Sequence, residues 1–134
     1  MYCFSTMEQF AKLRESMRRE LKQLLDTEAE PMFVAINEAV NNAIFHGNGS
    51  DSSKKVCLAI TSLPGKIKVT IRDDGQGFKL VPRSSTVDNL REHGRGLEII
   101  GFCVDDYYFN EQPSEIVLIK KTAILPADAE KNNF

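Results

Sequence analysis

Residues 38–46 read E-A-V-N-N-A-I-F-H, and the other predictions for the chain follow from this stretch. On an α-helix, Glu38, Asn42 and His46 are spaced four residues apart, so each lies only about 40° from the one before it. A carboxylate, an amide and an imidazole therefore share one helix face. Asn costs roughly 0.5 kcal/mol relative to Ala in mid-helix, so the tandem Asn41-Asn42 indicates a purpose other than helix formation.

Two glycine-rich segments follow, D-D-G-Q-G-F at residues 73–78 and H-G-R-G-L at residues 93–97. Taken alone, the first is a turn that leaves a strand, which is a common use of Asp-Gly pairs. An Asp fixed at a strand end can also accept a hydrogen bond from an adenine amino group, and neighbouring glycines leave room for a flat base. Asp73 is our candidate for that role.

The second segment, Gly94-Arg95-Gly96-Leu97, begins like a dinucleotide-binding fingerprint, but Ile99 stands where the third glycine would be. The sequence contains no P-loop motif either. What remains is a glycine-rich turn into a helix, whose N–H groups and positive dipole end favour phosphates, with Arg95 adding charge. Glu38 and Asn42 supply hard oxygen atoms of the kind that a magnesium nucleotide uses, so the three segments together predict one ATP site.

Composition narrows the class of protein. The 134 residues, 42% hydrophobic and 27% charged, are typical of one globular domain with its own core. A net charge of −2 gives no reason to expect nucleic acid or an anionic membrane as a partner. The longest apolar run, Met32–Ile36, is far shorter than the roughly 20 residues of a membrane helix, and the N-terminus lacks a signal-peptide layout. We therefore expect a cytoplasmic protein.

The cysteines and histidines are few and scattered. Cys3, Cys57 and Cys103 form an odd set without a C-x-x-C motif, and His46 and His93 are the only histidines. This pattern predicts neither a zinc site nor a disulfide framework.

Hydrophobic periodicity predicts two helices in the first part of the chain. Thr6–Leu25 lacks Gly and Pro and repeats apolar residues at helical spacing. A second helix begins near Glu30 or Pro31 and ends before Gly47. Its buried face, roughly opposite Glu38, consists of Phe33, Ile36, Val40 and Ala43.

From Val56 the period changes to two, which predicts an antiparallel hairpin with its turn at Leu63-Pro64-Gly65. A short helix from Gly96 to Cys103 and strands at Val104–Phe109 and Glu115–Lys121 follow. Helices first and antiparallel strands later predict an α+β domain, a two-layer sandwich with helices on one sheet face. We expect a single ATP-binding domain at residues 1–125 and a loose C-terminal tail at residues 126–134.

Together the three segments resemble the N, G1 and G2 boxes of the histidine kinase-like ATPase superfamily, which includes gyrase, the heat-shock chaperone ATPase and sensor histidine kinases. E-A-V-x-N-A-I-x-H-G and G-R-G-L-x-I-I are specific in combination, and the likeness covers roughly residues 6–121. Within the superfamily, the chain is most similar to the small anti-sigma factor serine/threonine kinases. The resemblance implies a sandwich with a mixed, mainly antiparallel sheet that binds ATP and Mg²⁺.

The resemblance also implies roles for individual residues. Glu38 corresponds to the catalytic carboxylate that orients or deprotonates the attacking hydroxyl, and Asn42 to the residue whose side-chain oxygen binds Mg²⁺. Asp73 corresponds to the residue that reads adenine. The other nucleotide-binding positions are His46, Gly75, Gly77, Gly94, Arg95, Gly96 and Leu97.

Residues 79–93 correspond to the lid over the nucleotide, in which Arg83 and Arg91 are either phosphate contacts or solvated charges. The chain departs from the family pattern at two places. The sequence Q-P-S-E at residues 112–115 replaces a glycine pair that members often carry. Only Met1–Ser5 represents the first strand, so an edge strand is either very short or absent.

Length favours one kind of relative, because 134 residues do not accommodate a following transducer domain or a helical dimerisation domain with a phospho-accepting histidine. The resemblance then implies a stand-alone serine/threonine kinase that phosphorylates an anti-anti-sigma partner and sequesters a sigma factor in its other state. It also implies a homodimer. Two alternatives stay open: a nucleotide-sensing binding module with little or no phosphoryl transfer, and a detached catalytic domain of a histidine kinase.

Overall fold

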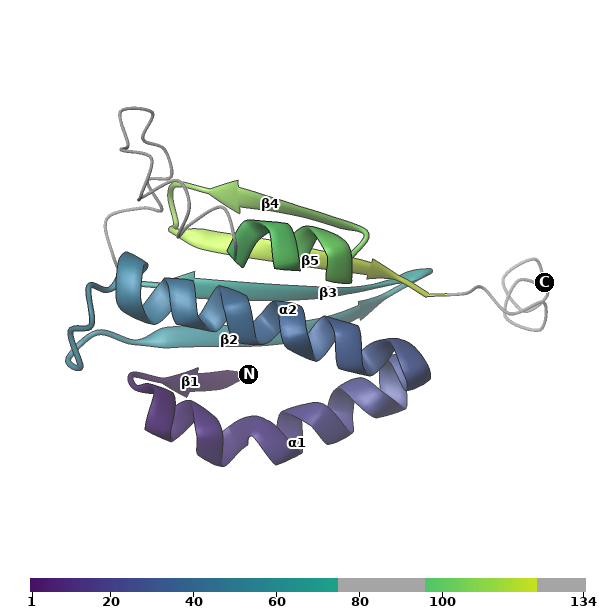
Figure 1. Ribbon diagram of the computed structural model, residues 1–134, viewed down its shortest axis with the longest axis horizontal. Helices are drawn as coiled ribbons and strands as arrows, with labels where there is room; N and C mark the ends of the chain where they lie inside the picture. The colour runs from purple at the N-terminus through teal and green to yellow at the C-terminus, as the bar shows by residue number, and fades with distance from the viewer. Residues whose placement is uncertain (75–95, 123–134) are drawn as a thin grey trace.

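The computed structural model describes residues 1–74 and 96–122 (Figure 1). A three-residue strand and two long helices come first, and the other strands follow. The elements are β1 (Tyr2–Phe4), α1 (Met7–Leu25), a 3-10 turn (Asp26–Glu28), α2 (Ala29–Asn42), a π-helical turn (Ala43–Gly47), β2 (Val56–Leu63), β3 (Lys66–Asp73), a helix over residues 96–103, β4 (Asp106–Asn110) and β5 (Glu115–Lys121).

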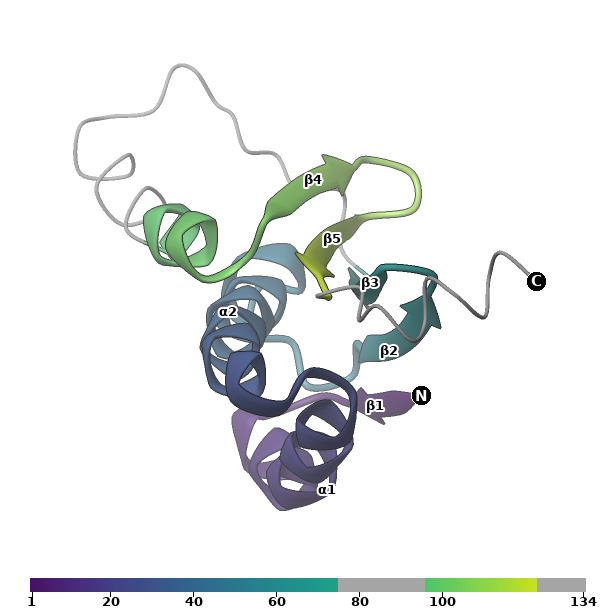
Figure 2. The ribbon, with the colours of Figure 1, turned by 90° about the vertical axis from the view of Figure 1, so that its right-hand side faces the viewer.

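The strands form one sheet in the order β1-β2-β3-β5-β4. Figure 2 shows α1, α2 and helix 96–103 on one side of this sheet, so the molecule has two layers. The prediction of an α+β sandwich with helices on one sheet face is confirmed. The expected sheet was mixed and mainly antiparallel, and every pairing among the described strands is antiparallel.

Helix α1 begins and ends as its sequence predicted. The hydroxyl of Thr6 caps the helix by accepting a hydrogen bond from the Gln9 N–H at 3.1 Å. The Gln9 side chain in turn accepts the Ser5 N–H at 2.7 Å, so two N–H groups at the helix start have partners. Asp26, with φ +53, ends the helix after Leu25.

Helix α2 supplies the centre of the core. It begins at Ala29, one residue before the predicted start, and Pro31 lies in its first turn, where a missing N–H costs little. Its α-helical part ends at Asn42, and a π-helical turn carries the chain to Gly47, which the sequence had placed beyond the helix. The predicted inner face of Phe33, Ile36, Val40 and Ala43 is buried.

The β2–β3 hairpin confirms the period-two prediction. Val56 pairs with Asp73 at one end and Leu63 with Lys66 at the other, and Gly65, with φ +74, makes the turn. The inward side chains of β3 and β5 complete the core against α2. These are Ile67, Val69, Ile71, Ile116 and Leu118. Strand β5 has its predicted bounds, and β4 begins two residues later than expected.

Strand β1 is present but short, and it carries a correction to the cysteine prediction. Cys3 lies directly opposite Cys57 on β2, and the two form a disulfide, with Cα atoms 4.1 Å apart. The prediction of no disulfide framework was therefore wrong. The pairing has no local signal in the sequence, because the two cysteines are 54 residues apart and the β1–β2 register brings them together. The Tyr2 hydroxyl also donates to Glu20 on α1 at 2.6 Å. Burial and this carboxylate raise the pKa of Tyr2 to about 12.

No helix within residues 1–74 or 96–122 is both long enough and apolar enough to cross a membrane.

Reduction of the Cys3–Cys57 disulfide is expected to lower the free energy of unfolding by up to about 4 kcal/mol, because the bond closes a loop of 54 residues in the unfolded chain. Urea unfolding with and without reductant measures the change. Cys103→Ser is the matched control, since Cys103 is a free thiol and its loss should not alter the response to reductant. Equal midpoints in both conditions would mean that the two sulfurs are not joined in solution.

Candidate functional site

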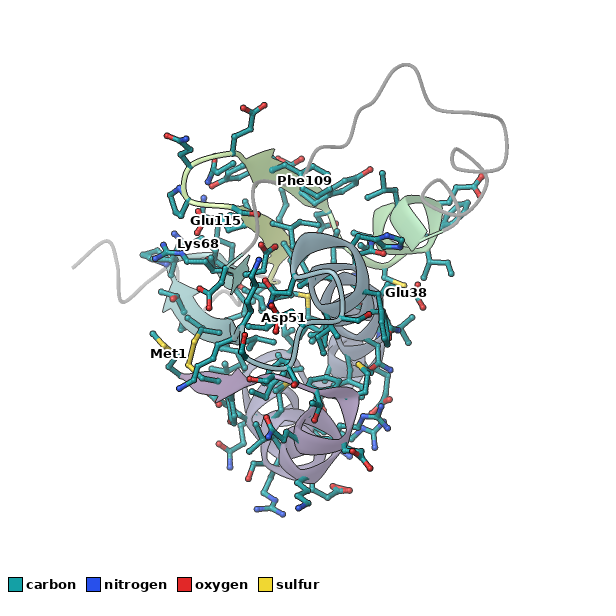
Figure 3. All side chains as sticks on the ribbon, turned by 90° about the vertical axis from the view of Figure 1, so that its left-hand side faces the viewer. Met1, Glu38, Asp51, Lys68, Phe109 and Glu115 are labelled. Atoms are coloured by element: carbon teal, nitrogen blue, oxygen red, sulfur yellow. A yellow bond between two sulfur atoms is a disulfide. The ribbon has the colours of Figure 1, made fainter. Side chains whose placement is uncertain are left out.

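One face of α2 and the start of helix 96–103 meet at the predicted catalytic residues. Glu38 and Asn42 lie one helical turn apart, and both are half-buried. A Cβ atom built on Gly96 would lie 3.5 Å from Glu38 Oε1 and 3.4 Å from Asn42 Nδ2. Figure 3 shows Glu38 on the side of α2 that borders helix 96–103. The first and third sequence segments therefore come together, although 54 residues separate Asn42 from Gly96.

Asp73 ends β3 and is buried, with 5% of its surface exposed. Its N–H donates to the Ser114 carbonyl at 3.0 Å, and its Oδ2 accepts the Ser114 hydroxyl at 3.1 Å. Ser114 is itself 5% exposed and directly precedes β5. A neighbouring strand therefore fixes this carboxylate through both backbone and side chain.

The backbone of Gly47 lies against the same carboxylate. A Cβ atom at residue 47 would lie 2.6 Å from Asp73 Cγ, which is closer than real side chains approach, so this position requires glycine. In the sequence analysis, Gly47 marked the end of the second helix and closed the E-A-V-x-N-A-I-x-H-G motif, without a role of its own. The structure shows that it joins the end of α2 to the end of β3.

His46 lies four residues after Asn42, beyond the α-helical part of α2. It is in the π-helical turn Ala43–Gly47 and is exposed. A π-helical turn holds more residues than an α-helical one, so the chain leaves the α-helical period at this point. The sequence gave no signal for this change of period.

Leu97 is half-buried and packs against the core at the start of helix 96–103. The other predicted nucleotide contacts lie outside the described residues, as does the predicted lid at residues 79–93 with its two arginines. These contacts are Gly75, Gly77, Gly94 and Arg95.

A buried lysine holds the far end of helix 96–103. Lys120 Nζ donates to the Cys103 carbonyl at 2.9 Å and pairs with Glu28 at 2.8 Å, which suits the negative end of a helix. Burial raises the pKa of the Cys103 thiol; the Lys120 charge opposes this shift, and the Glu38 carboxylate adds to it. Lys120 thus links the end of helix 96–103 to β5 and to the turn before α2.

Ser114 and Gly47 are the site residues that sequence reasoning missed. Gly47 is the last residue of the E-A-V-x-N-A-I-x-H-G motif but had no assigned role, and the role of each residue is identified only by what it contacts at Asp73. The described residues thus form two groups: Asp73 with Ser114 and Gly47 at the end of β3, and Glu38 and Asn42 beside Gly96. The first group contains a buried carboxylate, and the second contains oxygen atoms beside a glycine on a helix. This arrangement fits the class of nucleotide-binding α+β domains.

Comparison with known proteins identifies the family. The family model described as histidine kinase-like ATPase domain matches residues 4–120. The anti-sigma F factor of Bacillus subtilis (strain 168) is 29% identical over 124 residues, which are 88% of this chain and 84% of the relative. The anti-sigma F factor of Heyndrickxia coagulans is 30% identical over 124 residues, 87% of this chain and 83% of the relative.

The serine-protein kinase RsbW of Oceanobacillus iheyensis is 28% identical over 101 residues, or 69% of this chain, and the match spans 64% of that relative's length. The chain belongs to the histidine kinase-like ATPase domain family, as its three segments predicted. Membership of this family implies ATP binding, and relatives within it are named as anti-sigma factors and serine-protein kinases.

Gly47→Ala is expected to lower the free energy of unfolding by about 1–3 kcal/mol, because the added methyl group displaces a carboxylate that Ser114 holds in place. Chemical denaturation monitored by circular dichroism measures the loss. Gly101→Ala is the control: its Cβ would have Tyr107 at 3.8 Å as its nearest neighbour, so stability should stay equal or rise by up to about 1 kcal/mol. If both variants matched the wild type, the close approach at residue 47 would be wrong.

Proposed function

We propose that the protein is a regulatory serine/threonine kinase of the anti-sigma factor type. It transfers the γ-phosphate of ATP to a Ser or Thr of an anti-anti-sigma partner, and it sequesters a sigma factor in its other state. The observation that carries the proposal is the closeness of Gly96 to both Glu38 and Asn42: even a Cβ atom at residue 96 would lie 3.5 Å from Glu38 Oε1 and 3.4 Å from Asn42 Nδ2, which brings the predicted phosphate loop beside a carboxylate suited to a hydroxyl. The names of the relatives support the substrate class.

The adenine end of the site is assigned to Asp73. Its carboxylate accepts a hydrogen bond from the adenine amino group, whereas the carbonyl of guanine at the equivalent position would repel it. Burial strengthens this discrimination, because water cannot take the place of the missing donor. In this proposal Gly75 and Gly77 lie beneath the base.

The phosphate end is assigned to Gly94, Arg95, Gly96 and Leu97, with His46 at its margin. Asn42 provides the side-chain oxygen for Mg²⁺. The residues present fit that ion, because an amide oxygen is a hard ligand and the missing Cβ of Gly96 leaves space beside it. When bound, Mg²⁺ offsets the negative charge on the phosphates.

Glu38 is assigned to the transfer step. It orients the hydroxyl of the acceptor Ser or Thr and takes its proton as the oxygen bonds to the γ-phosphorus. The bond between that phosphorus and the β–γ bridging oxygen breaks, and ADP leaves. Since Glu38 is half-buried, it is shielded from bulk water and still accessible to an incoming side chain. The acceptor supplies the hydroxyl, so the partner must bind over this face of α2.

Glu38→Ala is expected to retain ATP affinity and to slow phosphoryl transfer by roughly 10²-fold or more, since the general base is lost and the nucleotide contacts remain. Transfer of labelled γ-phosphate to an authentic acceptor protein measures the rate, and calorimetry measures the affinity. Glu98→Ala, an exposed carboxylate on helix 96–103, is the matched control.

Unchanged transfer in Glu38→Ala would remove this residue from the mechanism. Binding of ATP without transfer to any acceptor would support the nucleotide-sensing module instead. An acid-labile product would identify a phosphohistidine and support the detached histidine kinase domain, because phosphoserine survives acid.

Asp73→Asn is expected to weaken ATP binding by about tenfold or more and to narrow the preference for ATP over GTP, because the amide offers a donor where adenine also has one. Calorimetric titration of both nucleotides in the presence of Mg²⁺ measures the two affinities. Asp106→Asn, at an exposed position on β4, should leave them unaltered. An identical nucleotide preference before and after the change would contradict the assignment.

A further inference from the structure

Asn48 is a buried amide in an otherwise exposed loop. Only 4% of its surface is accessible, whereas Gly49, Ser50 and Asp51 beside it are exposed. Figure 3 labels Asp51 in this loop, which leads from the end of α2 to β2. A polar side chain is buried at a cost unless its hydrogen bonds are made within the protein, so its partners indicate what it does.

The Asn48 side chain connects the ends of two strands. Its Nδ2 donates to the Lys55 carbonyl at 3.1 Å, just before β2 begins. Its Oδ1 accepts the Asp74 N–H at 2.8 Å, just after β3 ends. The Asn48 N–H donates to the Ala43 carbonyl at 2.8 Å, which fixes the residue to the end of the helix. Through its side chain and its backbone N–H, this one residue therefore links the end of the helix to the ends of β2 and β3.

A third hydrogen bond closes the arrangement. The Lys55 N–H donates to Asp74 Oδ2 at 2.8 Å, so Asn48, Lys55 and Asp74 are joined pairwise. We call these three residues the Asn48 triangle. The triangle holds the Asp74 carboxylate against the loop backbone and fixes the peptide that directly follows Asp73.

The chemistry of the triangle requires an amide at residue 48. One end of the side chain faces a carbonyl oxygen and must donate, and the other faces an N–H and must accept. A carboxylate would keep the second bond and set its negative charge against the Lys55 carbonyl. An apolar side chain would remove the hydrogen-bond partner of both backbone groups.

We propose that Asn48 is the positioning residue for adenine recognition, an inference that rests on the proposed nucleotide site. Asp73 is fixed on its β5 side by Ser114 and on its helix side by the backbone of Gly47, and Asn48 immediately follows that glycine. The triangle holds Gly47 against the carboxylate and holds the peptide after it. Without the Asn48 side chain, the bonds that hold the peptide after Gly47 against the peptide after Asp73 are lost, and the carboxylate direction is less fixed.

The test compares Asn48→Ala and Asn48→Asp with Ser53→Ala. Ser53 is exposed in the same loop and bonds only to Asp51 in the described contacts, so its loss leaves the triangle intact. Affinities for ATP and GTP are measured by calorimetry at a temperature where circular dichroism shows a folded protein. We expect Asn48→Ala and Asn48→Asp to weaken ATP binding by about tenfold and GTP binding by less, while Ser53→Ala matches the wild type.

The ratio of the two affinities separates positioning from a general structural role. Folded Asn48→Ala with wild-type ATP affinity would overturn the proposal, and so would equal losses for ATP and GTP. If Asn48→Ala does not fold, Asp74→Ala removes one side of the triangle at an exposed residue and should narrow the ATP preference in the same direction.

The outcome for Asn48 is distinguishable from that for the kinase. The measurement needs no acceptor protein, so ATP binding that depends on Asn48 without phosphoryl transfer would contradict the kinase and support the positioning residue. Phosphoryl transfer together with normal ATP selectivity in every variant would support the kinase and contradict the positioning role of Asn48. A wild-type protein that binds neither nucleotide would overturn both.

Discussion

The orientation of α2 about its own axis determines which of its side chains face the candidate site. Ile36 and Val40 are fully buried, and a buried aliphatic side chain contributes roughly 1.5–3 kcal/mol. A shift of one residue position turns the helix by about 100° and would expose these side chains. The apolar face therefore holds α2 in one orientation, and that orientation turns Glu38 and Asn42 toward Gly96.

Elements encoded by local patterns could be predicted from the sequence. Apolar spacing identified α1, α2 and the β2–β3 hairpin, because 3.6-residue and two-residue periods leave their mark within one element. The disulfide and the role of Ser114 could not be predicted. Each depends on the register between segments far apart in the chain, and β1, with three residues, is too short to carry a pattern of its own.

Some features of the candidate site could likewise be predicted from the sequence, and others could not. Three short sequence motifs identified Glu38, Asn42, Asp73 and Gly96 as candidate site residues. The structure brings three of them, Glu38, Asn42 and Gly96, into one cluster. The π-helical turn beyond Asn42, which contains His46, could not be predicted from the sequence. Contacts of the backbone, such as that of Gly47 with Asp73, have no signature in a side-chain pattern.

The start of β2 is held from two directions within three residues. Cys57 is bonded to Cys3 on the edge strand, and Lys55 is hydrogen-bonded to Asn48 and Asp74 just after the end of β3. A strand end fixed on both sides cannot slip in register, because one step would turn every side chain of β2 to the other face. The edge strand and the end of β3 that carries Asp73 are thus held by the same short segment, residues 55–57.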